Sequence, residues 1–238
     1  MRKRTKIILI SLASVLVCII AAVFIYFSIY YKAVDVEPYL NSDENVSVEK
    51  IKDGYFFDSS ENDKALIFYP GAKVDTKAYA PLCYEIAKSG YDVFLIDMPF
   101  HFAIFGVNKA DKIIENYNYE SYYIAGHSLG GAMAANYAYK NASKLKGLLL
   151  LAAYSTKDLS DTNLTVLSIY GENDGVLNRG KVEAGRALMP TSYYEYIIQG
   201  GNHAQFGSYG KQKKDNDASI SAASQIEETV SFIDKNFN

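Results

Sequence analysis

The longest uninterrupted apolar stretch of the chain lies near its N-terminus, from Ile7 to Tyr31. It contains no charged residue, and its clearly polar positions are three serines. A helix of this length would extend about 37 Å, which is enough to cross the hydrocarbon core of a bilayer with some tilt. The pattern therefore predicts one transmembrane helix within residues 1–31.

The charges before this stretch indicate its orientation. Four basic residues precede it: Arg2, Lys3, Arg4 and Lys6. Because basic flanks are retained on the cytoplasmic side, we expect a single-pass protein of the cell membrane whose remaining residues lie on the extracellular side. A cleaved signal peptide is the alternative. It is disfavoured because the apolar stretch is longer than a usual signal-peptide core and no small-residue cleavage site closes it.

The pattern changes after this stretch. Polar residues 32–45 predict a stalk, and the folded domain is expected to cover residues 46–238. The domain opens with apolar positions on both sides of Asp53-Gly54, which is typical of a β-hairpin. Short continuous apolar runs, typical of strands buried on both faces, then alternate with helical spacing of three and four residues. The predicted strands are 65–69, 93–96, 122–125, 148–151, 166–170 and 193–198, and the predicted helices are 79–86, 110–117, 132–139, 181–189 and 220–233.

This alternation predicts an α/β fold with a mostly parallel central sheet and helices on both faces. Sheets of this kind bind their ligands beyond the carboxyl ends of the strands, so the segments that follow the strands are the first places to look for chemistry. Only residues 152–164 lie between the predicted strands that end at 151 and begin near 166, and this segment is too short for a helical cap. We therefore expect no large cap domain.

Composition narrows the function classes. The chain is 49% hydrophobic and 21% charged, with a formal net charge of −3. Without the four N-terminal basic residues, the 20 remaining basic and 27 acidic residues give the exported part a net charge of −7. An acidic domain of this kind argues against nucleic-acid binding. Of the two cysteines, Cys18 lies in the membrane stretch and Cys83 on the apolar face of a helix, so no disulfide framework is predicted.

The segment Gly126-His-Ser-Leu-Gly130 carries the strongest chemical signal. It follows a predicted strand and precedes an alanine-rich helix. In a turn of this kind the central serine is held in a strained backbone conformation that exposes its hydroxyl, and glycines are needed on both sides because the backbone comes close to itself. Ser128 is therefore predicted to be a nucleophile.

A serine nucleophile needs a base and an acid that orients the base. Of three histidines, His127 lies inside the turn and His101 precedes Ser128, so His203, which follows the last strand, is the predicted base. The acid should follow the preceding strand, which makes Asp174 the candidate and Glu172 an alternate. Asp158 and Asp161 precede that strand and are poorly placed.

Two further groups complete the predicted site. The backbone N–H groups of Leu129 and Ala72 are expected to form the oxyanion hole, because one begins a helix and the other follows the first long strand. A cluster of apolar residues after residue 96 predicts either core packing or the wall of a substrate pocket. Its members are Met98, Phe100, Phe102 and Phe105.

Four segments together resemble a known family: 70–75, 126–131, 168–174 and 200–207. In this order the chain resembles the serine-dependent α/β-hydrolases, and within them the small group without a cap that is related to dienelactone hydrolase. The resemblance implies the α/β-hydrolase fold and a triad of Ser128, Asp174 and His203. Dienelactone hydrolases use a cysteine nucleophile, so the serine here argues against that particular activity.

The expected activity is therefore hydrolysis of carboxylic esters or related acyl substrates through an acyl-enzyme, with no metal and no organic cofactor. Acyl transfer to another acceptor would use the same residues. A binding module on a hydrolase scaffold is the alternative from a different class, and an intact triad argues against it. The expected partners are a small acyl substrate and, through the N-terminal helix, the membrane.

Overall fold

The computed structural model describes residues 3–60 and 63–237, and it divides the chain into two compact units, residues 1–30 and 31–238. The first unit contains α1 (Lys3–Ser28). Within the described residues, Ile10–Ser28 is the one helical segment long and apolar enough to cross a membrane, with a mean hydropathy of 2.7. Of the basic residues used to predict orientation, Arg2 lies outside the described residues, as do the side chains of Lys3 and Arg4.

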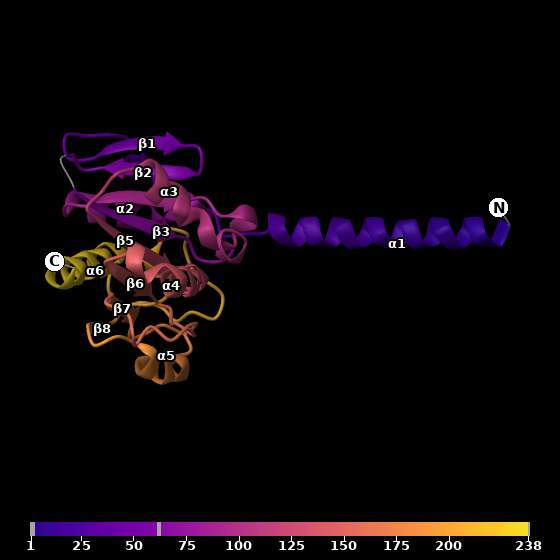
Figure 1. The fold of residues 1–238 in the computed structure, drawn as a ribbon. Helices are drawn as coiled ribbons and strands as arrows, with labels where there is room; N and C mark the ends of the chain where they lie inside the picture. Colours follow the sequence, from indigo (N-terminus) through magenta and orange to yellow (C-terminus); the bar gives the residue numbers. More distant parts are fainter. Residues whose placement is uncertain (1–2, 61–62, 238) are drawn as a thin grey trace. The chain divides into compact units, whose positions relative to one another are not determined.

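The second unit is built on one sheet, which runs through the compact part of Figure 1. Over the described ranges it has eight strands in the order β1-β2-β4-β3-β5-β6-β7-β8. The first two strands pair antiparallel as a hairpin, β2 pairs antiparallel with β4, and all other pairs are parallel. The strands are β1 (Ser47–Ile51), β2 (Gly54–Asp58), β3 (Lys64–Tyr69), β4 (Asp92–Ile96), β5 (Ser121–His127), β6 (Gly147–Leu151), β7 (Thr165–Gly171) and β8 (Tyr193–Ile198).

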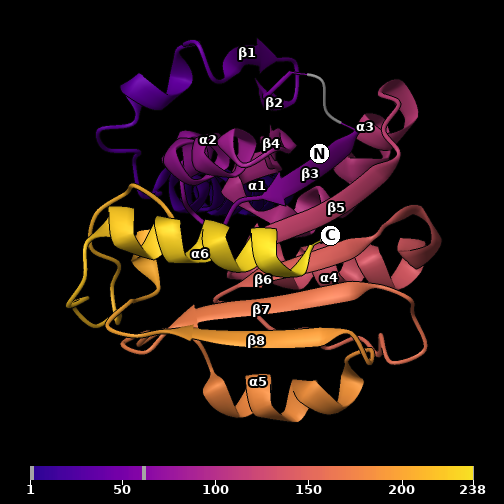
Figure 2. The same ribbon diagram turned by 90° about the vertical axis from the view of Figure 1, so that its left-hand side faces the viewer.

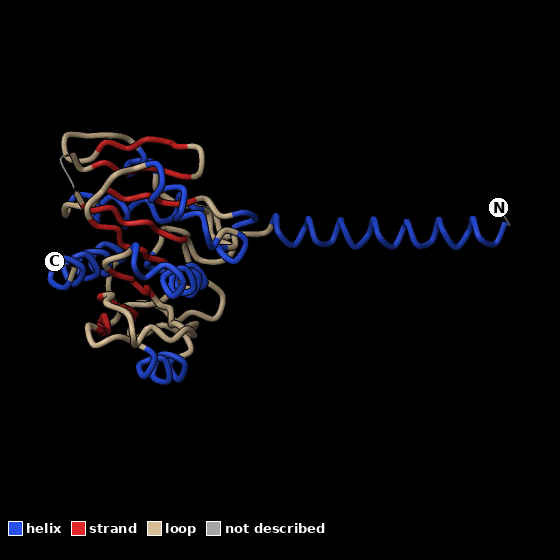
Figure 3. Tube along the Cα trace, in the orientation of Figure 1, coloured by secondary structure: helices blue, strands red, loops and turns tan. Residues whose placement is uncertain are grey.

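Helices connect the parallel strands, except β6 and β7, and cover both faces of the sheet. In Figure 2, α2 and α6 lie in front of the sheet and α4 lies behind it. Figure 3 shows the alternation of strands, in red, and helices, in blue, along the chain. The helices of this unit are α2 (Ala80–Lys88), α3 (Ala110–Asn116), α4 (Leu129–Asn141), α5 (Arg179–Gly185) and α6 (Ala222–Asn236).

Alternate residues of each central strand enter two separate cores. In β3, Leu66 and Phe68 pack into the core that also contains residues of α2 and α6, whereas Ile67 packs into the core formed with α3 and α4. All three side chains are fully buried. Burial of one such side chain stabilises the folded state by about 1.5–3 kcal/mol, which is why strands in this position are apolar at every residue.

The elements predicted from the sequence are confirmed, including the hairpin at Asp53-Gly54 and the parallel sheet. Their ends differ from the prediction by at most three residues, except that the helix predicted to reach 189 ends at Gly185 and continues as a short 3-10 turn, Arg186–Leu188. Residues 152–164 connect β6 to β7 without a helix, so no large cap is present among the described residues.

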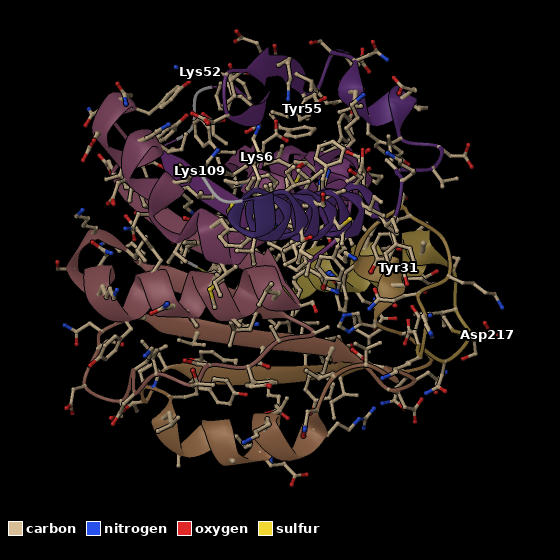
Figure 4. The ribbon with its side chains drawn as sticks, turned by 90° about the vertical axis from the view of Figure 1, so that its right-hand side faces the viewer. Lys6, Tyr31, Lys52, Tyr55, Lys109 and Asp217 are labelled. Atoms are coloured by element: carbon tan, nitrogen blue, oxygen red, sulfur yellow. The ribbon has the colours of Figure 1, made fainter. Side chains whose placement is uncertain are left out.

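The segment predicted as a stalk, residues 32–45, is instead part of the compact unit. Its Val36 and the following Val46 are 3% and 1% exposed. Tyr31 begins the unit: its N–H donates to the Lys73 carbonyl (2.7 Å) and its carbonyl accepts from the Asp75 N–H (2.9 Å). In Figure 4 its side chain lies beside the chain segment that carries Asp217, where its hydroxyl accepts from the Lys213 N–H at 3.0 Å. The segment differs from the predicted stalk because the apolar residues among its polar ones bury their side chains against the domain.

Candidate active site

Ser128 lies in the sharp turn between β5 and α4. Its backbone angles are φ 53° and ψ −121°, which a residue with a side chain rarely adopts. The Ser128 N–H donates to the Leu151 carbonyl of the neighbouring strand at 2.9 Å, and this bond fixes the turn against the sheet. The Ser128 side chain is half-buried. Strain of this kind persists because the surrounding contacts leave the turn no alternative.

Those contacts require glycine on both sides of Ser128. A Cβ on Gly126 would lie 2.4 Å from the carbonyl carbon of Gly130. One on Gly130 would lie 2.1 Å from the Tyr69 carbonyl oxygen, at the end of β3. Contacts this short with backbone atoms cannot be relieved by a side-chain movement, so the spacing Gly126-x-Ser128-x-Gly130 is a packing requirement, as the sequence predicted.

His203 and Asp174 form a buried hydrogen-bonded pair. The His203 Nδ1 and the Asp174 Oδ2 are 2.8 Å apart, and the two side chains are 1% and 0% exposed. The other carboxylate oxygen of Asp174 accepts from the N–H groups of Val176 (2.8 Å) and Leu177 (2.7 Å). With Asp174 accepting from Nδ1, the neutral ring has its unprotonated nitrogen at Nε2, which is the atom a general base uses.

The Nε2 atom of His203 has no hydrogen-bond partner among the described residues. Ser128, Leu129 and His203 line one cavity of about 250 Å³. The serine hydroxyl and the unpartnered ring nitrogen therefore border the same space. Hydrogen bonds between a nucleophile and its base are often long in the absence of substrate, so an unpaired Nε2 is compatible with a base that engages the serine once an acyl group is bound.

The alternate acid has another contact. The Glu172 carboxylate accepts from the Gly200 N–H at 3.0 Å, and Asp158 accepts from Ser160 in its own turn at 3.0 Å. Neither contacts His203. Of the acidic residues considered from the sequence, Asp174 is the one hydrogen-bonded to the histidine.

The predicted oxyanion donors lie in different surroundings. Leu129 begins α4, where first-turn N–H groups lack acceptors within the helix, and it lines the cavity. Ala72 does not line it. The neighbouring N–H groups are both engaged, Gly71 with the Tyr79 hydroxyl at 3.0 Å and Lys73 with the His101 carbonyl at 2.8 Å. The loop after β3 is therefore held on both sides of Ala72.

The apolar cluster after β4 does not line the cavity. Met98 is buried against Gly106, and Phe102 is half-buried. Phe100 and Phe105 are 61% and 54% exposed. The cavity wall is instead formed by residues that follow β6 and β7: Ala152, Ala153, Tyr154, Val176, Leu177 and Asn178.

A second buried histidine, which the sequence did not single out for a role, contacts the site. The Tyr79 hydroxyl accepts from the Gly71 N–H at 3.0 Å and is hydrogen-bonded to the His127 Nδ1 at 2.8 Å. The rings of His127 and His203 are 4.5 Å apart between centroids. Burial, followed by the proximity of His203, lowers the pKa of His127 well below its usual value. His127 therefore stays neutral beside His203.

Asp215 connects the two loops that carry Asp174 and His203. Its carboxylate accepts from the N–H groups of His203 (3.3 Å), Ala204 (2.8 Å) and Gly175 (3.0 Å). A carboxylate that accepts three backbone N–H groups from two loops fixes their relative position. Sequence reasoning missed this role, because nothing in a polar, lysine-rich segment distinguishes a bridging aspartate from a solvated one.

Comparison with known proteins identifies the family. The sequence model of the alpha/beta hydrolase family matches residues 65–227, which is more than half of the chain. The chain belongs to the alpha/beta hydrolase family. The matched residues include Ser128, Asp174 and His203, so the geometry described above lies within the part of this alpha/beta hydrolase that carries the family pattern.

A solved structure shares the fold. The crystal structure of a predicted CIB-like hydrolase from Thermoplasma acidophilum superposes with a TM-score of 0.63 over 80% of this chain and 99% of that one. The two sequences are 12% identical, so the similarity concerns the fold alone. No curated protein matches this alpha/beta hydrolase in sequence.

The buried His127 predicts a pH-dependent stability. In the unfolded chain a histidine binds a proton below about pH 6.5, whereas folded His127 stays neutral. The unfolded state then holds more protons, so stability should fall as pH decreases below that value, by up to about 1.4 kcal/mol per pH unit. His127→Gln should remove this part of the slope.

The measurement is the free energy of unfolding of the full chain in detergent, followed by near-ultraviolet circular dichroism across this pH range. The half-buried His101, changed to Gln, is the matched control and should flatten the slope less. An unchanged slope in His127→Gln would show that His127 titrates normally.

The bridging role of Asp215 predicts a large difference between two neighbouring aspartates. Asp215→Ala leaves backbone N–H groups of two loops without their acceptor and should lower the free energy of unfolding by about 2 kcal/mol. Asp217→Ala removes a side chain that is 78% exposed and paired only on the surface with Lys211, so its effect should stay within about 0.5 kcal/mol. Chemical denaturation of the two variants beside wild type measures both values, and equal losses would argue against the bridge.

Proposed function

We propose that this alpha/beta hydrolase is a serine hydrolase that cleaves carboxylic esters or related acyl substrates. One observation carries the proposal: a strained, half-buried Ser128 borders the same cavity as the unpartnered Nε2 of a histidine whose Nδ1 is bonded to a buried aspartate. That combination supplies a nucleophile, a base with the correct tautomer and a fixed acid.

In the proposed reaction, the Ser128 Oγ attacks the ester carbonyl carbon while its proton passes to the His203 Nε2. The developing oxyanion accepts a hydrogen bond from the Leu129 N–H, which begins α4 at the cavity, and the Ala72 N–H, outside the cavity lining, is the second donor that the sequence predicts. His203 then gives the proton to the leaving alkoxide oxygen as the carbon–oxygen bond breaks, which leaves Ser128 acylated. A water molecule, deprotonated by His203, attacks the acyl carbon, and the proton returns to the Ser128 Oγ as the acid is released.

The surroundings of the cavity favour hydrolysis over transfer to a second acceptor. No helix of the described residues 152–164 covers the site, so water reaches the acyl-enzyme directly. A cavity volume of about 250 Å³ is below the roughly 300–1,000 Å³ usual for ligand sites and suits a short acyl group.

We also propose that Ile10–Ser28 anchors the protein in the cell membrane, with residues 31–238 on the extracellular side. The length and hydropathy of the segment and the four preceding basic residues support this proposal.

The triad can be tested by substitution. Ser128→Ala and His203→Ala should each lower kcat/KM for a soluble short-chain ester by about 10⁴ or more, because each removes a group that forms or breaks a bond to the transferred proton. Asp174→Asn should be severe as well, since it no longer fixes the histidine tautomer. A fluorophosphonate probe should label wild type and leave Ser128→Ala unlabelled.

The exposed Ser160, changed to Ala, is the matched control and should keep full activity and labelling. Retained ester hydrolysis in a folded Ser128→Ala protein would refute the mechanism.

The topology can be tested on intact cells. A C-terminal epitope should be lost when protease is added outside, and an N-terminal epitope should survive until the cells are lysed. Digestion of the C-terminal epitope only after lysis would reverse the orientation. A shortened form released into the medium would support the signal-peptide alternative.

A further inference from the structure

Three exposed apolar side chains gather on the loop after β4. Phe100, Ile104 and Phe105 are 61%, 55% and 54% exposed, which makes them the most exposed large apolar residues of the described part of unit 31–238. The rings of Phe100 and Phe105 contact each other edge to face, with centroids 5.9 Å apart. We call these three residues the apolar loop patch. Single exposed apolar residues are ordinary, but a cluster of this kind marks an interaction surface.

The backbone of the loop that carries the patch adopts angles that its residues rarely take. Phe100 has φ 55° and ψ 23°, and the adjacent His101 has φ 57°. Left-handed angles are rare for bulky residues, and two in succession are costly. The His101 carbonyl is fixed by the Lys73 N–H at 2.8 Å, so the loop is tied to the neighbouring loop after β3.

That neighbouring loop also receives the start of the compact unit. Tyr31 bonds to Lys73 and Asp75, so the patch and Tyr31 are attached to the same short segment. Three residue steps separate Tyr31 from Ser28, the last residue of the apolar span, and they cover at most about 11 Å. A membrane that holds the span therefore passes close to the loop that carries the patch.

The patch also lies beside the catalytic edge of the sheet. The loop follows the carboxyl end of β4, Ser128 follows that of β5, and the 3-10 turn Ala103–Phe105 packs against α4, the helix that begins after Ser128. A membrane in contact with the patch would thus lie along the same edge as the catalytic serine.

We propose that the apolar loop patch inserts into the interfacial layer of the bilayer in which Ile10–Ser28 is anchored, so that the carboxyl edge of the sheet faces the lipid headgroups. The inference rests on the proposed membrane anchor. Phenylalanine and isoleucine side chains gain apolar contact in this layer that water denies them, and aromatic rings are favoured at the interface. The patch is a second membrane contact, made by the hydrolase domain itself.

The chain contains no tryptophan, so a single introduced indole reports on its own surroundings. The full-length F105W variant is reconstituted in lipid nanodiscs, with and without lipids brominated near the headgroup end of the acyl chains. We expect a blue-shifted emission and roughly a twofold or greater loss of fluorescence with brominated lipid, because an indole at the interface contacts the acyl chains. I104W repeats the measurement if F105W does not fold.

Y194W is the matched control. Tyr194 is 46% exposed on β8, an edge strand that four other strands separate from β4, the strand before the patch. It should show a solvent-like emission that brominated lipid does not quench. A blue shift of F105W without quenching would mean that a second copy or another protein covers the patch, and it would overturn the proposal, as would quenching equal to that of Y194W. Failure of the chain to co-elute with the discs would overturn the anchor together with the patch, while hydrolysis of a soluble ester by the same samples reports on the catalytic proposal separately.

Discussion

The hydrogen bond between Asp174 and His203 is the interaction on which the site depends. A buried carboxylate is costly unless hydrogen bonds replace its water, and Asp174 receives them from His203 and from two backbone N–H groups. Asp215 then fixes the loops of both residues through their backbones. The position of the His203 ring is therefore set by the protein interior, and only its Nε2 edge is left for chemistry.

Much of this arrangement could be predicted because local and global signals agree. The central strands are mostly apolar, the apolar residues of the helices recur every three or four positions, and the turn at Ser128 needs glycines that the sequence supplies. Asp174 and His203 could be named because carboxyl ends of parallel strands meet at one edge, so residues far apart in the chain share a site. The family match to residues 65–227 agrees with the predicted fold class, although the order of the strands was not readable from the sequence.

The remaining features depend on contacts that no local pattern encodes. Tyr31 is hydrogen-bonded to Lys213, which lies 182 residues further along the chain. Residues 32–45 follow Tyr31 and pack on the domain, although their composition is typical of a stalk. The aromatic residues after β4 were predicted as a possible pocket wall because they follow the carboxyl end of a strand, where sheets of this kind bind ligands. Left-handed backbone angles at Phe100 and His101 direct the loop elsewhere, and residues after β6 and β7 line the cavity instead. His127, set aside in the sequence because it lies inside the turn, contacts His203 because the turn buries it.

The order of the strands in the sheet places the start of the compact unit near Ser128. Neighbouring strands in a sheet are about 4.8 Å apart, so the loops after β4, β3 and β5 must lie side by side at the carboxyl edge. Tyr31 is hydrogen-bonded to the loop after β3, the apolar patch follows β4, and Ser128 follows β5. The start of the folded unit is therefore attached at the same edge of the sheet as Ser128.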